Sequence, residues 1–357
     1  MAQFTMGSFI RWSSSMRQSV TSQTRSYASK SAIPTFAPTS SPELDQLLNR
    51  FRQDRFIPSG LPNQQRRNTF KEKHKQRLEE EPITVAISET EDFTLRPMTI
   101  NELPTKSDAY EVLRLIAVNN EWKALVPFLS GLYMSNLRLS NNRLEQLVRK
   151  ASDAGKLPII MECIRQSHRT GFYLRDLGVV KRLFFDIHVL AQNGDFKGVA
   201  VTKALNMAKQ AVDLMNQYAA THSSSVKADI PQNQPFVIGT LLELSAARAI
   251  SDFGGKDQAN EVLSYARKLV AAWPIFQEQS KKAVADDFPS ARARAQETLA
   301  VYNGLRLSLS IHGLALDKEL HASVTQCLAE AKSELEKVSG ALERSPIEEL
   351  VLSILKG

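Results

Sequence analysis

The sequence predicts an all-α protein, an α-solenoid of stacked helical hairpins with a disordered basic N-terminal extension. Two observations indicate the solenoid. One short turn pattern recurs three times between Ala109 and Gln217, and apolar residues at helical spacing flank each turn. A third observation indicates the extension, because nine basic residues stand against two acidic ones between Arg50 and Arg77.

The helical hairpins repeat in their packing positions as well as in their turns. The turns are Asn119-Asn120-Glu121-Trp122, Ala154-Gly155-Lys156-Leu157 and Asn193-Gly194-Asp195-Phe196. Before the first turn, the apolar positions are Ala109, Val112, Leu113 and Ile116, and a shift of 35 residues gives Leu144, Leu147, Val148 and Ala151. After it, Trp122 and Leu125 map in the same way onto Leu157 and Ile160. A third, looser copy follows at a shift of 39. One hairpin cannot bury its own apolar stripe, so the pattern predicts stacking.

The stretch from Leu144 to Asp176 resembles a pentatricopeptide repeat unit. It carries Asp153-Ala154-Gly155-Lys156-Leu157 at the turn and Arg169-Thr170-Gly171-Phe172 at the exit. The whole repeated region is similar to the pentatricopeptide and tetratricopeptide families in degenerate form. The resemblance implies a helical-repeat protein with a concave binding surface.

The positions that read bases in pentatricopeptide proteins differ here. The resemblance places them at Tyr110 and Ser140 in the first unit, Glu145 and Arg175 in the second, and Phe184 in the third. An aromatic or acidic residue there does not supply the hydrogen bonds that a base edge requires. We therefore do not expect a base-by-base RNA code.

The N-terminus has the composition of a mitochondrial transit peptide. Its first 42 residues contain no acidic side chain, and Arg11, Arg17, Arg25 and Lys30 stand among many serines and threonines. We expect residues 1–27 to be this presequence, with cleavage near Tyr27, and the mature protein to lie in the mitochondrial matrix.

A basic, largely extended arm is expected at residues 28–104. Its candidate RNA-binding residues are Arg66, Arg67, Lys71, Lys73, Lys75 and Arg77. Each Lys or Arg that contacts a phosphate releases a counterion, which favours RNA as the ligand. A solvated charged linker is the alternative. Within the arm, Glu43 to Phe56 suits a short helix, and Ile83 to Met98 alternates as a small β-hairpin would.

The remaining chain divides into two helical parts. We expect pentatricopeptide-like repeats at 105–220, a linker at 221–235, and a second helical-repeat half at 236–357. In that half, helices are expected at 236–250, 258–273, 290–312 and 317–338. The capping box Ser345-Pro346-Ile347-Glu348 starts a last helix that caps the stack.

No catalytic pattern emerges from the reactive residue types. Cys163 and Cys327 stand in helical patterns, and the six histidines have no metal-ligand spacing. No run approaches the ~18 apolar residues of a membrane helix. The sequence therefore predicts no enzyme, no cofactor, no metal, no small-molecule substrate and no transmembrane segment.

Two functions remain open. The first is a non-enzymatic mitochondrial gene-expression factor, a subunit or companion of the mitochondrial ribosome. Its basic arm would bind mitochondrial ribosomal RNA or mRNA, and its helical scaffold would bind mitochondrial ribosomal proteins. The second is a scaffold or assembly factor for an inner-membrane respiratory complex, without RNA contact. The candidate protein-binding residues of the concave face are Trp122, Tyr133 and Tyr173.

Overall fold

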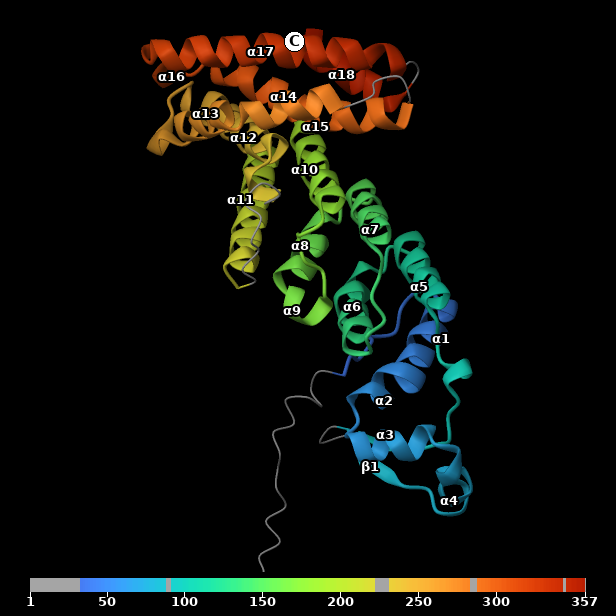
Figure 1. The fold of residues 1–357 in the computed structure, drawn as a ribbon. Helices are drawn as coiled ribbons and strands as arrows, with labels where there is room; N and C mark the ends of the chain where they lie inside the picture. The colour runs from blue at the N-terminus through green and yellow to red at the C-terminus, as the bar shows by residue number, and fades with distance from the viewer. Residues whose placement is uncertain (1–32, 88–90, 222–230, 283–287, 343–344, 357) are drawn as a thin grey trace, which may run out of the picture.

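The computed structural model describes residues 33–87, 91–221, 231–282, 288–342 and 345–356. Helices dominate this part of the chain, and its strands form one short hairpin, which confirms the predicted all-α class. The presequence expected at residues 1–27 and most of the expected 221–235 linker lie outside the described residues. The helices form an elongated array that starts at an N-terminal module and ends at a crosswise layer of C-terminal helices (Figure 1).

The N-terminal module, residues 33–104, corrects the expectation of a largely extended, disordered arm. Its elements are α1 (Pro42–Phe51), the π-helical η1 (Arg52–Phe56), α2 (Ile57–Gly60), α3 (Asn63–Phe70), η2 (Glu72–His74), α4 (Lys75–Glu80), β1 (Thr84–Ala86), β2 (Asp92–Thr94) and η3 (Ile100–Glu102). Apolar burial explains why this segment folds. Leu44, Leu48 and Phe51 are buried on one face of α1, which packs on α5 (Lys106–Val118). The short helix predicted from Glu43 is thus present.

A second, smaller core closes the module. The hairpin predicted within Ile83–Met98 is confirmed, with Val85 opposite Phe93 in an antiparallel pair. Both side chains are buried together with Leu78 of α4 and Leu95. The hairpin therefore holds α4 in place, although α4 itself is almost entirely polar.

The three predicted hairpins form side by side (Figure 1). The first joins α5 to η4 (Trp122–Ala124) and α6 (Leu125–Met134); the second joins α7 (Asn141–Asp153) to α8 (Leu157–Arg165) and α9 (Ser167–Thr170); the third joins α10 (Leu177–Gln192) to α11 (Gly198–Thr221). Each turn contains a residue in the left-handed region: Asn120 at φ 58°, Gly155 at φ 67° and Asp195 at φ 51°. Asn, Gly and Asp tolerate this conformation better than other residues, which explains the recurring turn pattern.

The C-terminal helices differ from simple further hairpins. They are η6 (Pro231–Asn233), α12 (Pro235–Phe253), η7 (Gln258–Asn260), α13 (Glu261–Ala271), α14 (Trp273–Lys282), α15 (Phe288–Ser308), α16 (His312–Leu316), α17 (Lys318–Ser339), η8 (Gly340–Leu342) and α18 (Pro346–Lys356). Helices α15, α17 and α18 lie across the end of the hairpin array (Figure 1). The predicted single helix at 258–273 is replaced by η7 and α13, with α14 starting at Trp273. The predicted helix at 290–312 ends at Ser308, and α16 follows.

Helix α12 connects the two parts of the molecule. Phe236, Val237 and Leu241 join the core of the hairpins, whereas Ile238 and Leu242 join the core of the C-terminal helices. The helix crosses α15 closely, because a Cβ placed on Gly304 would lie 2.7 Å from the carbonyl oxygen of Gly239. One helix thus contributes a buried face to each part.

Candidate nucleic-acid interface

The six predicted RNA-binding side chains are all exposed on one folded segment. Arg66 and Arg67 lie on α3, Lys71 and Lys73 follow it, and Lys75 and Arg77 lie on α4. Among the described residues, only Lys75 meets a carboxylate, with its Nζ 3.7 Å from Oε1 of Glu72. The other five cations have no acidic partner in this part of the chain and are available to an external anion.

The three other arginines of the basic segment have a different role. Arg52 pairs with Glu91 and donates from Nε to the Pro34 carbonyl at 3.0 Å. Arg55 donates to the Pro104 carbonyl at 2.6 Å, and burial lowers the pKa of its guanidinium. Arg50 donates to the Glu102 carbonyl at 3.4 Å. These side chains fix the module to its own backbone and are not free for RNA.

The aromatic residues interleaved with the basic segment are mostly core residues. Phe51 and Phe56 are fully buried, and their rings lie 5.2 and 6.0 Å from the ring of Phe128 on α6. Neither can stack on a base. They anchor the basic segment to the first hairpin.

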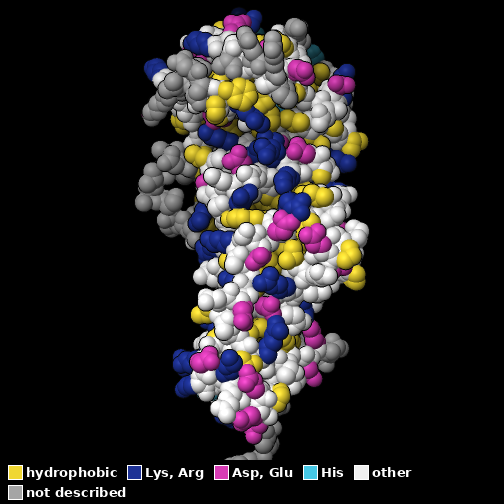
Figure 2. Space-filling model, turned by 90° about the vertical axis from the view of Figure 1, so that its right-hand side faces the viewer, with side chains coloured by type: hydrophobic (Ala, Val, Ile, Leu, Met, Phe, Trp, Pro, Cys, Tyr) yellow, Lys and Arg dark blue, Asp and Glu magenta, His cyan; other side chains and the backbone are white. Residues whose placement is uncertain are grey.

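Charge on the neighbouring face of the molecule is mixed. Figure 2 shows Lys and Arg side chains interspersed with Asp and Glu side chains over the whole height of the array. Several are internal pairs, such as Arg114 with Glu111 at 2.6 Å. Exposed pairs of this kind attract an anion weakly. The segment from Arg66 to Arg77 differs in that six exposed cations follow one another within twelve residues.

The structure corrects the expectation that Trp122 belongs to a protein-binding surface. Its side chain is 1% exposed and lies in the core of the hairpins, so it cannot contact a partner. The signal was present in the repeat itself. Trp122 occupies the position of Leu157 in the second unit, and both are packing positions.

Tyr133 and Tyr173, the other two predicted protein-binding residues, do lie together. They line a cavity of about 290 Å³ with Tyr218 of α11 and the arginines Arg138 and Arg175. We call it the tyrosine cavity. The rings of Tyr173 and Tyr218 lie 5.1 Å apart, and the Arg138 guanidinium lies 5.3 Å from the ring centre of Tyr133. Burial, with a hydrogen bond to Tyr133, raises the pKa of the Tyr173 hydroxyl. No sequence pattern connected Tyr218 or Arg138 to this place.

Two of the three positions that would read bases on the first helices are occupied by internal contacts, whereas Glu145 is exposed. Phe184 is buried, with its ring 6.3 Å from that of Phe236. The Arg143 guanidinium covers the ring of Tyr110 at 4.4 Å. Both observations agree with the expectation that no base-by-base code operates.

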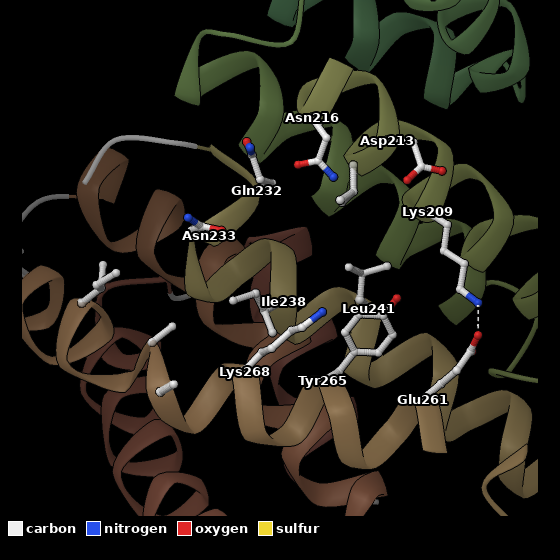
Figure 3. Close-up of a pocket in the computed structure, with 14 residues that line it drawn as sticks. Lys209, Asp213, Asn216, Gln232, Asn233, Ile238, Leu241, Glu261, Tyr265 and Lys268 are labelled. Carbon is white, nitrogen blue, oxygen red and sulfur yellow. Dashed lines mark hydrogen bonds and ion pairs between the residues drawn. The ribbon is translucent and has the colours of Figure 1, made fainter. Parts of the chain in front are cut away.

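A larger cavity, of about 800 Å³, lies between α11, α12 and α13 (Figure 3). Lys209 and Glu261 face each other there, with Nζ 2.6 Å from Oε1. Asp213 and Asn216 also line it, but the lining contains no histidine or cysteine to act as nucleophile or base.

Reactive groups elsewhere in the described residues are buried in packing. The pKa of both thiols, Cys163 and Cys327, is raised to about 12 by burial, so neither is a thiolate at neutral pH. Burial likewise raises the pKa of Asp186 to about 6, although its partner Arg182 opposes this. Within the described ranges, no group of His, Cys, Asp and Glu side chains is placed to hold a metal, and no helix is long and apolar enough to cross a membrane.

The fold and this surface define a helical-repeat scaffold that carries a compact basic module. The family model of mitochondrial ribosomal protein mS27 matches residues 19–352, and the chain therefore belongs to this family. It is also similar to the small ribosomal subunit protein mS27 of Neurospora crassa, with 27% identity over 259 residues. This match covers 68% of the chain and spans 65% of the length of that relative.

Family membership favours the first of the two functions that the sequence left open. It confirms a mitochondrial ribosomal protein and a location in the mitochondrial matrix. It does not favour the assembly factor for a respiratory complex.

Proposed function

We propose that this protein is a structural, non-enzymatic component of the small mitochondrial ribosomal subunit, which binds ribosomal RNA through its N-terminal module. The observation that carries the proposal is the set of six exposed cations on α3, on α4 and in the segment between them. Five of them lack an acidic partner in the described structure. The name of the Neurospora crassa relative, a small ribosomal subunit protein, supports the small subunit as the site of assembly.

The helical array serves as the scaffold in this proposal. It is a degenerate pentatricopeptide-like stack, as its spacing of 35 residues and its left-handed turn residues suggest. Such arrays present long surfaces to ribosomal proteins. A non-enzymatic role agrees with the burial of both thiols, Cys163 and Cys327.

The test is charge reversal of the six exposed cations. Replacing Arg66, Arg67, Lys71, Lys73, Lys75 and Arg77 by Glu should abolish co-sedimentation with the small subunit on a sucrose gradient of mitochondrial lysate. Binding to purified ribosomal RNA should fall and lose much of its salt dependence, because fewer counterions are released. Circular dichroism should show unchanged helical content, since all six side chains are solvent-exposed.

A matched control has the same change in net charge at the other end of the molecule. Its sites are the exposed cations Lys256, Lys268, Lys281, Lys318, Lys332 and Lys337. This variant should remain on the small subunit. Retained RNA binding by the first variant, or equal losses in both, would contradict a specific role of α3 and α4.

A further inference from the structure

The tyrosine cavity is lined by the end of α6, the start of α7 and the loop after α9, with Tyr218 of α11. It is formed where the chain leaves the first two units, at the end of α6 and after α9, together with the last turns of α11. These three helix ends lie along one edge of the array (Figure 1). Of the positions that pentatricopeptide proteins use to read bases, the cavity lining includes Arg175 but not Tyr110, Glu145 or Phe184.

The loop that carries Tyr173 is held firmly. Its neighbours Phe172 and Leu174 are buried in the core, which directs Tyr173 away from it. The Thr170 hydroxyl donates to the Cys163 carbonyl at 2.7 Å and accepts from the Phe172 amide at 3.2 Å. Such a loop presents its aromatic ring without a large loss of conformational entropy on binding.

Close packing also fixes Tyr133. Gly171 has φ 71°, and a Cβ there would lie 2.4 Å from Cδ2 of Tyr133. The absence of a side chain at Gly171 thus makes room for the ring. The guanidinium of Arg138 also lies 5.3 Å from the centre of this ring. The cavity is built from rigid rings and a cation.

The lining of the cavity selects for an anionic, planar ligand. Its lining residues include two arginines and three tyrosines but no Asp or Glu. The volume of about 290 Å³ is at the small end of the ~300–1,000 Å³ of ligand pockets, which suits one base and excludes a helix. Unstacked bases in single-stranded RNA are held by aromatic rings and arginine planes in this way.

We propose that the tyrosine cavity binds one unstacked base of single-stranded ribosomal RNA, with Arg138 and Arg175 on the adjoining phosphates. This inference rests on the proposed function. It assigns to the scaffold an RNA contact of a different physical kind from that of α3 and α4. The basic module supplies charge, whereas the tyrosines supply stacking.

The test uses the full chain and two labelled RNA probes in fluorescence anisotropy, over a series of salt concentrations. One probe is an oligouridylate, and the other is an abasic oligoribonucleotide of equal length with the same phosphates. The wild-type protein should bind the probe with bases about tenfold more tightly, which is the scale of one stacked base. The variant Tyr133→Leu/Tyr173→Leu should lose this preference and bind both probes alike.

The salt dependence separates this site from the basic module. The double Leu variant should keep the salt slope of the wild type, since it loses no phosphate contact, whereas charge reversal on α3 and α4 should lower the slope for both probes. Tyr133→Phe/Tyr173→Phe is the matched control, because it retains the rings and should retain the preference for bases. Circular dichroism on both variants reports whether the fold is intact.

Three results would overturn the inference. In the first, the wild-type protein binds both probes equally tightly. In the second, the double Leu variant still prefers the probe with bases. In the third, the double Leu variant is folded and binds RNA as the wild type does, but no longer binds a ribosomal protein. The last result would make the cavity a protein contact and leave the basic module untouched.

Discussion

At the scale of single residues, a buried polar cluster joins three helices. Nδ1 of His188 on α10 lies 2.8 Å from Oε2 of Glu243 on α12, and the Asn303 amide on α15 donates to Oε1 of Glu243 at 2.6 Å. All three side chains are fully buried. Glu243 is therefore the acceptor that satisfies two neighbours, and its loss would leave both without this partner.

Replacing Glu243 by Leu should therefore be strongly destabilising. We expect a loss of about 3–5 kcal/mol in the free energy of unfolding, as for other broken buried pairs. Urea denaturation followed by circular dichroism measures it. Glu336→Leu is the control, because Glu336 forms only an exposed pair with Lys332 and should cost less than about 1 kcal/mol. Similar losses in the two variants would contradict the role of the cluster.

Single residues also show where sequence reasoning succeeds and fails. The packing positions were predictable, because Ala109, Val112 and Ile116 recur at helical spacing, and all are fully buried. Trp122 was misassigned to a binding surface because aromatic residues serve both cores and interfaces. Its register with Leu157 was the stronger signal. Tyr218 and Arg138 could not be predicted as partners, since only the stacking of units brings α11 to the end of α6.

At the scale of elements, the packing of α1 on the first hairpin is what makes the basic segment a folded module and not an extended arm. The rings of Phe51 and Phe56 lie 5.7 Å apart and pack against Phe128 of α6. Sequence indicated a short helix from Glu43, but not that its apolar face has a partner on the first hairpin. Helices α3 and α4 were missed because each buries a single residue, Thr69 or Leu78. Helices of this kind are stabilised by their contacts with neighbouring elements.

Removing the two rings should release the module. In Phe51→Ala/Phe56→Ala, we expect faster amide hydrogen exchange in α1 and α2, because each Phe→Ala change in a core costs about 3–5 kcal/mol. Exchange in α12 and α15 should stay as in the wild-type protein. Phe70→Ala is the matched control, since Phe70 is only half-buried. Unchanged exchange in α1 of the double variant would show that other contacts anchor the module.

At the scale of the whole molecule, α12 prevents the two helical parts from being independent. It buries one face against α10 and α11 and another against α15. An ion pair crosses the same boundary, with Nζ of Lys181 on α10 2.5 Å from Oε1 of Glu297 on α15. The linker predicted at 221–235 was placed at a break in the helical pattern. Sequence did not show that the helix after it packs on both sides.

Cutting the chain in this linker should leave the two parts together. With a protease site inserted between Thr221 and Pro231, the cleaved fragments should co-elute in size-exclusion chromatography and separate only in denaturant. The reason is that large buried apolar surfaces hold them, as in an obligate interface. A cleavage site inserted between Gly357 and an added C-terminal tag controls for the protease itself. Separate elution of the two fragments would show that the 221–235 linker divides independent domains.

The folded state of the basic module has a thermodynamic consequence. A segment that orders on binding spends part of its interaction free energy on its own folding and buries new apolar surface as it does so. Here Arg50, Arg52 and Arg55 already hold the backbone, and the exposed cations stand on a frame that exists before any contact. Association with RNA should then resemble the meeting of two rigid surfaces, with a small change in heat capacity and an affinity governed by ionic strength.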